Sequence, residues 1–415
     1  MENLGLKNIF TNTISQLTVR FLSSFSTLIV TLLISYFLGI SLFGSFTKIV
    51  TFVSLFYLAV DFGINGIFIQ KTREEIEKNF INLILLRFLL SLILYICIGL
   101  ITIVLPYNAA SSIGFSSFEK IGILIYSFTL FTQGLAISFA AIQQKTKNYK
   151  TSIIPSFITS VTLLSFVLAG TFLQNIYIIL LSYVMSGILF GVLLFFSVLK
   201  KFPVKKKVHN FFKFSKPLLF SSAPLGLILL FNLIYAKADT VILSFLRPTG
   251  DIGIYGFSYR IFEFLIAIPA FFANSIYPLL LEKKSTSFFY RDIKRYSFLL
   301  TLISIVFIFF VFFLSPLLPV LKPELSYVIL PIRILSLSLP FFFLTSILQW
   351  VLVIENKKMF LIFLYLFSLF LNIVLNIFYI PHYSYIAASV ITVICEGIVF
   401  SGMVVYLALQ RTKNI

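Results

Sequence analysis

Four charged residues lie in a long apolar stretch, "KADTVILSFLRPTGDIGIYGFSYRIFEF" (237–264), in the second half of the chain. They are Lys237, Asp239, Arg260 and Glu263. A charged side chain at membrane depth is costly, and such residues commonly mark the path of a substrate or an ion. Basic groups from separate helices would suit a phosphorylated headgroup, because arginine offers a planar fork of donors and lysine a point charge.

Three further cations, Arg20, Arg87 and Arg333, lie in other apolar runs. Lys237, Arg260 and Arg333 lie roughly 12–14 Å below the outer ends of their predicted helices, close to the middle of a hydrocarbon core about 30 Å thick. Arg20 and Arg87 lie about 10–12 Å from the cytoplasmic ends of theirs. We predict that these five cations bind substrate; the alternative is that they form ion pairs that only fix packing, which is the preferred interpretation for Arg20 and Arg87.

The acidic residues in the spans are predicted charge partners or ion-coupling sites for H⁺ or Na⁺. Arg260 and Glu263 are three residues apart on one helix face, so they should partly neutralise each other. Lys237 and Asp239 face differently, so each needs another partner. Glu396 stands alone in the last span, either as a coupling site or as a neutral structural carboxyl group. The four acids are Asp61, Asp239, Glu263 and Glu396.

Three prolines lie inside the predicted helices that carry the matched cations: Pro224, Pro269 and Pro340. Proline removes a backbone hydrogen bond and permits a bend. We predict that these positions act as hinges; ordinary tolerance of proline in membrane helices is the alternative. Lys48, near the outer end of its span, is expected to snorkel to the membrane surface.

The composition indicates that a bilayer is the solvent of this chain. Of 415 residues, 60% are hydrophobic and only 11% are charged, which a soluble protein of this size could not accommodate. Apolar runs long enough to cross a membrane recur along the whole chain. We predict an all-α polytopic membrane protein with about twelve transmembrane helices: 12–38, 45–68, 80–105, 119–142, 150–172, 174–199, 217–246, 251–281, 296–319, 325–354, 359–380 and 384–409.

The basic residues predict the orientation of these spans. Twenty-three of the 32 Lys and Arg residues fall at the two termini and in the loops on the same side, whereas three fall on the other side. By the positive-inside rule both termini are cytoplasmic. The net charge of +18 is therefore explained by topology, and nucleic acid is not an expected partner.

Two similar halves are predicted. "SYFLGISLFGSF" (35–46) resembles "LSFLRPTGDIGIY" (243–255), with a Phe-Leu pair at a helix end and a Gly opening the next helix. We predict two six-helix bundles, 1–199 and 217–415, joined by a basic cytoplasmic linker, 200–216. With six spans in each, a pseudo-two-fold axis would run along the membrane normal, and a central cavity between the halves would be the default substrate site.

Metal chemistry and extramembrane catalysis are not expected. Cys97 and Cys395 both lie in apolar spans, and His209 and His382 lie in different loops, so no metal-ligand spacing exists. The longest outer loop, 106–118, is too short for a catalytic domain. The sequence thus predicts a transporter without a metal or an organic cofactor.

Several motifs resemble a known family. "FLGISLFGSF", "AVDFGINGIFIQK" and "ADTVILSFL…GIYGFSYRIFEFL…IP" are similar to the polysaccharide-exporting branch of the multidrug/oligosaccharidyl-lipid/polysaccharide (MOP) superfamily, and most similar to Wzx-type flippases of oligosaccharide repeat units. The resemblance implies transport of an undecaprenyl-diphosphate-linked oligosaccharide, such as an O-antigen unit of lipopolysaccharide, to the periplasmic leaflet of a bacterial inner membrane. It also implies membrane lipids and polysaccharide polymerase or chain-length proteins as partners.

Two other functions are weighed against a flippase. A MATE-like ion-coupled antiporter would share the fold, but a cationic drug would require a cavity rich in carboxylates, and the spans hold six cations against four acids. A membrane-embedded polysaccharide polymerase or glycosyltransferase would need a cluster of catalytic polar residues at one face. The sequence shows no such cluster, so this alternative is the less favoured one.

Overall fold

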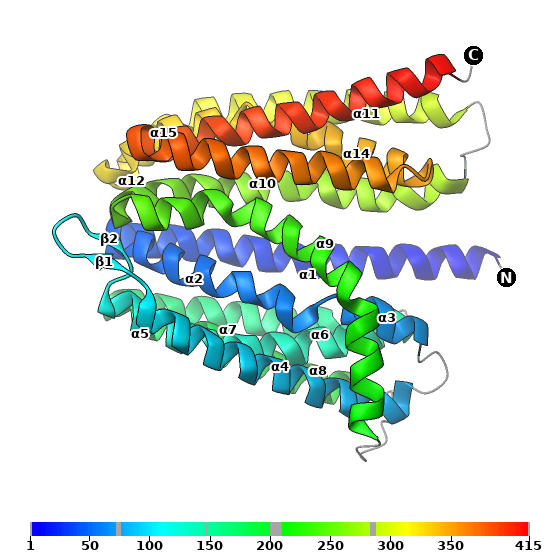
Figure 1. Cartoon of the computed structure of the whole chain (residues 1–415), viewed down its shortest axis with the longest axis horizontal. Coiled ribbons are helices and arrows are strands. Elements are labelled where there is room, and N and C mark those ends of the chain that lie inside the picture. The colour runs from blue at the N-terminus through cyan, green and yellow to red at the C-terminus, as the bar shows by residue number, and fades with distance from the viewer. Residues whose placement is uncertain (1, 72–75, 147, 200–209, 283–287, 414–415) are drawn as a thin grey trace. The chain divides into compact units, whose positions relative to one another are not determined.

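The structure, a computed structural model, describes residues 2–71, 76–146, 148–199, 210–282 and 288–413. Apart from one short hairpin, all elements in these ranges are helices (Figure 1). The chain divides into two compact units. Unit 1 comprises Met1–Leu38 and Ser45–Lys237, and unit 2 comprises Gly39–Gly44 and Ala238–Ile415.

Unit 1 is a helical bundle in which α6 packs against both α4 and α8, and α7 packs against both α1 and α8. Its antiparallel hairpin pairs Tyr107 with Gly114. The elements are α1 (Glu2–Leu38), most of α2 (Ile40–Asp61), α3 (Ile64–Lys71), α4 (Ile76–Val104), β1 (Tyr107–Asn108), β2 (Ile113–Gly114), α5 (Ser117–Ser127), α6 (Thr129–Thr146), η1 (Tyr149–Ser152), α7 (Ile153–Phe172), α8 (Ile176–Leu199) and most of α9 (Phe211–Leu246).

Unit 2 is built around a large apolar core that α10, α11, α14 and α15 share. The helix α14 packs against each of the other three. The elements are the last turns of α9, then α10 (Thr249–Glu282), α11 (Phe288–Leu314), η2 (Ser315–Leu317), α12 (Leu318–Leu321), η3 (Pro323–Val328), α13 (Ile329–Ser336), α14 (Leu339–Ile354) and α15 (Lys358–Lys413).

The predicted number of membrane spans agrees with the fold. Within the described residues, eleven helical segments are long and apolar enough to cross a membrane. The last segment runs over 53 residues, and its backbone turns at Ser384 (φ 51°), three residues after Pro381, so it contains two passes. The predicted all-α fold with about twelve spans is confirmed.

The boundary between the units lies inside α9, between Lys237 and Ala238. The predicted boundary was the basic segment 200–216. Residues 200–209 of that segment lie outside the described residues, and 211–216 form the first turns of α9. Figure 1 shows that α9 bends along its length.

Two glycines from the repeated segments allow the starts of α2 and α10 to touch through their backbones. A Cβ on Gly44 would collide with the carbonyl oxygen of Thr249, and a Cβ on Gly253 would collide with that of Ile40. Each glycine therefore faces the carbonyl four residues before the other. Such close approach of helices is typical of small residues in membrane proteins, and here the similarity of 35–46 to 243–255 accounts for the reciprocal contact.

The three predicted hinge prolines have different surroundings. Pro224 lies inside the continuous α9. Pro269 is buried inside the continuous α10. Pro340 lies in the first turn of α14, after a break from α13 at which Leu337 and Ser338 donate to carbonyls three residues back instead of four. The role of all three as hinges stays a prediction.

Candidate functional site

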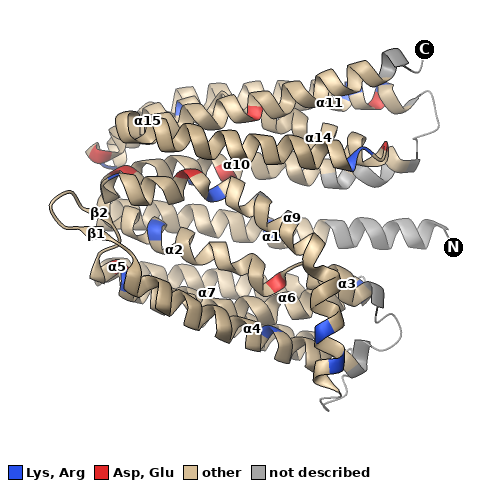
Figure 2. Cartoon of the chain, in the orientation of Figure 1, with Lys and Arg blue, Asp and Glu red and all other residues tan. Residues whose placement is uncertain are grey.

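Charged side chains are sparse along the helices (Figure 2), and several of them meet in buried polar networks. Arg87 in α4 is the centre of one network in unit 1. Its Nη2 donates to Asp61 Oδ1 at 2.9 Å and to Asn65 Oδ1 at 2.8 Å, and its Nη1 donates to Ser138 Oγ at 3.0 Å. The arginine side chain is only 1% exposed. The network ties α2, α3, α4 and α6 together, as a packing role requires.

The helix that carries Asp61 breaks immediately after it. Phe62 (φ 41°) and Gly63 (φ 69°) adopt left-handed conformations, so the span predicted as one helix over 45–68 is divided between α2 and α3. The break packs against α9 just after Pro224. A Cβ on Gly226 would lie 2.7 Å from the Phe62 ring, so glycine is required there for the ring to fit.

A second buried ion pair in unit 1 joins α2 to the start of α5. Lys48 donates to Glu119 Oε1 at 3.1 Å and to the carbonyl oxygen of Gly114 at 2.6 Å, and its side chain is fully buried. The expectation that Lys48 snorkels to the surface is therefore wrong. Glu119 is held by a capping box with Ser116, in which each side chain accepts from the other residue's backbone N–H.

Asp239 is the centre of a buried network in unit 2. Its Oδ2 accepts from Tyr255 Oη at 2.8 Å and from Thr392 Oγ1 at 3.0 Å, and its Oδ1 accepts from Asn376 Nδ2 at 2.8 Å. Asn376 also donates to Asn372. The donors come from α10 and from both passes of α15. Within the described part of the chain, Asp239 forms no ion pair, so neutral donors alone surround this carboxylate.

A third network lies along α10. Arg260 Nη1 donates to Glu263 Oε2 at 2.8 Å, which is the pair that the spacing predicted. Unlike Arg87, the Arg260 side chain is 21% exposed. Tyr259 is close enough to Glu263, Asp239 and Glu396 to interact electrostatically with each of them. The structure thus brings three of the four predicted acids into one neighbourhood of unit 2.

The remaining predicted cations lie on α1, α9 and α13. Arg20 is exposed on α1 and interacts with Tyr149. Lys237 is half-buried on α9. Arg333 on α13 does not contact Arg260, because its Nε donates to Ser315 Oγ at 2.9 Å and its Nη2 to the carbonyl oxygen of Phe312 at 3.0 Å.

The sequence interpretation missed the neutral members of the networks. Asn376, Thr392 and Tyr255 lie between 16 and 153 residues from Asp239 in sequence, and no spacing rule connects them. Glu119 was also missed, although the Ser-x-x-Glu pattern that begins at Ser116 is a capping-box signature that could have identified it.

The sequence of residues 6–284, about two thirds of the chain, matches the family model described as polysaccharide biosynthesis protein. The chain belongs to the polysaccharide biosynthesis protein family. No curated protein matches this family member by sequence.

Solved structures with a similar fold include a flippase and several transporters. Lipid II flippase MurJ in an inward closed conformation is 20% identical with a TM-score of 0.75, over 96% of this chain and 87% of that chain. An inward-facing multidrug resistance MATE family transporter of the MOP superfamily is 13% identical with a TM-score of 0.65, over 94% of this chain and 93% of that chain.

A third similar structure is a MOP superfamily transporter from Pyrococcus furiosus, whose binding pocket is reported to have reverse polarity. It is 12% identical with a TM-score of 0.60, over 98% of this chain and 95% of that chain. The chain therefore has the fold of these transporters. The family match and the shared fold agree with the resemblance seen in the sequence.

Proposed function

We propose that the chain is a flippase that moves an undecaprenyl-diphosphate-linked oligosaccharide from the cytoplasmic to the periplasmic leaflet. The cargo would be the repeat unit of an O-antigen or another surface polysaccharide. The observation that supports this most is the match of residues 6–284 to a polysaccharide biosynthesis family on a transporter fold. A large hydrophilic sugar cannot cross hydrocarbon unaided, so polysaccharide synthesis at a membrane needs such a step.

Within this proposal, Lys237 and Arg260 bind the anionic headgroup. Both side chains are partly accessible, whereas Arg87 is enclosed by its partners. The ion pair of Arg260 with Glu263 is partly solvated, so a diphosphate can compete for the guanidinium group at modest cost. Arg20 is exposed and could meet the headgroup at the cytoplasmic side, while Arg87 holds the fold.

Ion coupling is assigned to the acidic neighbourhood of unit 2. A buried carboxylate that only neutral groups surround is electrically unbalanced, so it favours uptake of H⁺ or Na⁺. Asp239 has these surroundings. Asp61 is a weaker candidate because Arg87 already balances its charge. Alternating access driven by exchange of a cation at Asp239 is the proposed mechanism.

We also propose that the protein lies in a bacterial inner membrane with both termini in the cytoplasm. The charge bias of the loops supports this orientation. Membrane lipids surround the protein, and a polysaccharide polymerase with its chain-length proteins would receive the flipped product.

A MATE-like antiporter is the second candidate, favoured by the similarity of the fold to MATE family transporters. The two candidates differ in what accumulates when the protein is absent. Depletion of a flippase should cause lipid-linked glycan to accumulate on the cytoplasmic leaflet, and surface polysaccharide should fall. Depletion of a drug antiporter should leave glycan export unchanged and reduce drug tolerance.

A pair of variants tests the site. Arg260→Ala should abolish glycan export while the amount of protein in the membrane stays normal. Arg247→Ala is the matched control, because Arg247, in the turn before α10, forms a similarly exposed ion pair with Asp251 of α10 at 2.9 Å. Equal loss of export in both variants, or loss of the protein itself, would contradict the assignment of Arg260.

A further inference from the structure

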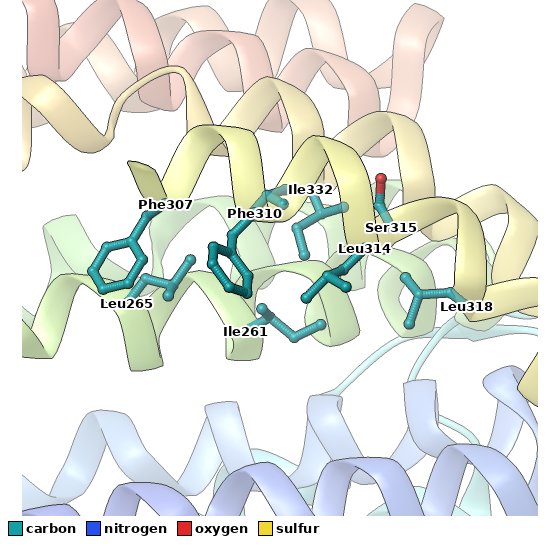
Figure 3. A pocket seen from close by; sticks show the side chains of 9 residues that line it. Ile261, Leu265, Phe307, Phe310, Leu314, Ser315, Leu318 and Ile332 are labelled. Atoms are coloured by element: carbon teal, nitrogen blue, oxygen red, sulfur yellow. The ribbon is translucent and has the colours of Figure 1, made fainter. Parts of the chain in front are cut away.

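An apolar pocket in unit 2 belongs to none of the networks described above. It lies among α10, α11 and α13 and has a volume of about 270 Å³. Figure 3 shows Phe310 and Leu314 of α11 extending toward Ile261 and Leu265 of α10 across this space. A cavity of about 150 Å³ is large enough for benzene, so this pocket has room for a segment of hydrocarbon chain.

The pocket lies beside a helix that is mostly exposed to lipid. In the most apolar part of the α11 span only 17% of the residues are buried. Two lining residues, Phe310 and Leu314, are 58% and 43% exposed. The hydrocarbon of the bilayer can therefore reach the pocket from the side of α11.

Arg333 lies at the polar end of the pocket. Ser315 lines the pocket and also accepts a hydrogen bond from Arg333 Nε at 2.9 Å. The guanidinium group also binds the carbonyl oxygen of Phe312 and lies 5.1 Å from the centre of the Phe312 ring. With 27 residues, α11 is about 40 Å long, so Ser315, which follows its last residue, reaches the headgroup region. Through its bond to Ser315, Arg333 therefore lies nearer the headgroups than the mid-membrane depth predicted from the sequence.

Arg333 differs from the other partly or fully buried arginines in having no acid beside it. Arg87, Arg247 and Arg260 each form an ion pair with a carboxylate. Over the ranges that the structure describes, Arg333 has no carboxylate partner, and its Nη1 has no hydrogen-bond partner. Its position is fixed by two neutral oxygens, which leaves its charge available to an anion from outside the protein.

We propose that this pocket and Arg333 form a binding site for one anionic phospholipid. The phosphate accepts hydrogen bonds from the guanidinium group, and one acyl chain fills the space between α10 and α11. Under the predicted topology the lipid belongs to the outer leaflet. This site does not include Lys237 or Arg260, the residues proposed to bind the headgroup of the cargo. The bound lipid would therefore be a membrane phospholipid and not a second copy of the cargo.

Charge favours a phospholipid over the tail and diphosphate of the proposed cargo. A phosphodiester carries one negative charge, which a single guanidinium group balances. A diphosphate brings more charge than one arginine can match. Among the described residues that line the pocket, Ser315 has a hydroxyl group and the others have apolar side chains. They therefore offer a diphosphate no second charged hydrogen-bond donor.

Native mass spectrometry of the full-length protein in detergent tests the proposal. The probes are phosphatidylglycerol and phosphatidylcholine with identical acyl chains. The wild type should retain phosphatidylglycerol in preference, and Arg333→Gln should lower this preference about tenfold, as expected for the loss of a charge-assisted hydrogen bond. Arg333→Lys should keep part of the preference.

Two tryptophan variants test the apolar part of the site. Val311→Trp fills the pocket from α11 and should reduce retention of both lipids. Val306→Trp is the matched control, because Val306 is on the same helix, is 52% exposed and does not line the pocket. An unchanged lipid preference in Arg333→Gln, or equal retention by the two tryptophan variants, would overturn the proposal. Displacement of bound phosphatidylglycerol by an equimolar amount of undecaprenyl diphosphate would also overturn it, and would assign the pocket to the cargo.

Discussion

Asp61 in unit 1 and Asp239 in unit 2 are both carboxylates within membrane helices, but their surroundings differ. Asp61 lies 2.9 Å from the Arg87 guanidinium group, whereas Asp239 accepts hydrogen bonds from Tyr255, Asn376 and Thr392. The first carboxylate has its counter-charge within the protein. The second has polar neighbours without a counter-charge, so a proton or a metal cation can supply what the protein does not. Under the proposed function, the charge of the neighbours therefore assigns a structural role to Asp61 and ion coupling to Asp239.

The largest effect on stability is expected from Arg87→Met. This change leaves Asp61 without its partner and should lower the free energy of unfolding by about 3–5 kcal/mol, as for other broken buried pairs. An unfolding titration in mixed micelles measures it. The double variant with Asp61→Leu removes both charges and should recover most of the loss. A single variant as stable as the wild type would mean that the pair does not hold unit 1 together.

Asp239→Asn should have a smaller effect on stability and a larger one on transport. The amide must turn an NH₂ group toward one of the three donors, which should cost about 1–2 kcal/mol. Glycan export should fall about tenfold or more, because a neutral amide cannot exchange a cation. Export assays at equal protein abundance provide the measurement.

Thr392→Val is the control for this variant. It removes one hydrogen bond to Asp239, worth about 1 kcal/mol, and keeps the carboxylate. Export should therefore persist in Thr392→Val. If both variants transport equally well, the carboxylate is structural, and the contrast with Asp61 disappears.

The smallest effect on stability is expected from Arg260→Gln. The pair with Glu263 is partly exposed, so its loss should change the free energy of unfolding by about 0–1 kcal/mol. Export should nevertheless be strongly reduced if Arg260 binds the headgroup. A large fall in the unfolding free energy would instead place this pair in the same class as Arg87 and Asp61.

The sequence predicts the spans well because span length depends on local hydrophobicity alone. It predicts the Arg260–Glu263 pair for a similar reason, since partners three residues apart on a helix meet without help from the rest of the fold. It fails at Lys48, because the partner Glu119 is brought close only by the packing of α5. It also fails at the break after Asp61, where the left-handed Phe62 depends on Gly226 of a distant helix.

The surroundings of Asp239 show the same limit more strongly. Neutral polar residues such as Asn376 and Thr392 are tolerated in many membrane helices, so neither residue signals a network by itself. Their meeting depends on the turn at Ser384, which returns the second pass of α15 toward the first. Only the tertiary fold distinguishes these residues from the other polar residues in the spans.

The backbone contact between Gly44 and Gly253 limits where α2 can bend. The first turn of α2 belongs to unit 2, and the rest of the helix belongs to unit 1. Gly44 and Gly253 both belong to unit 2, so their backbone contact holds the first turn of α2 on α10, and any change in the orientation of the units must be taken up beyond it, near Ser45. Beside the two glycines Phe43 and Phe257 pack edge to face with ring centres 6.1 Å apart, so side chains strengthen the attachment of this turn to α10.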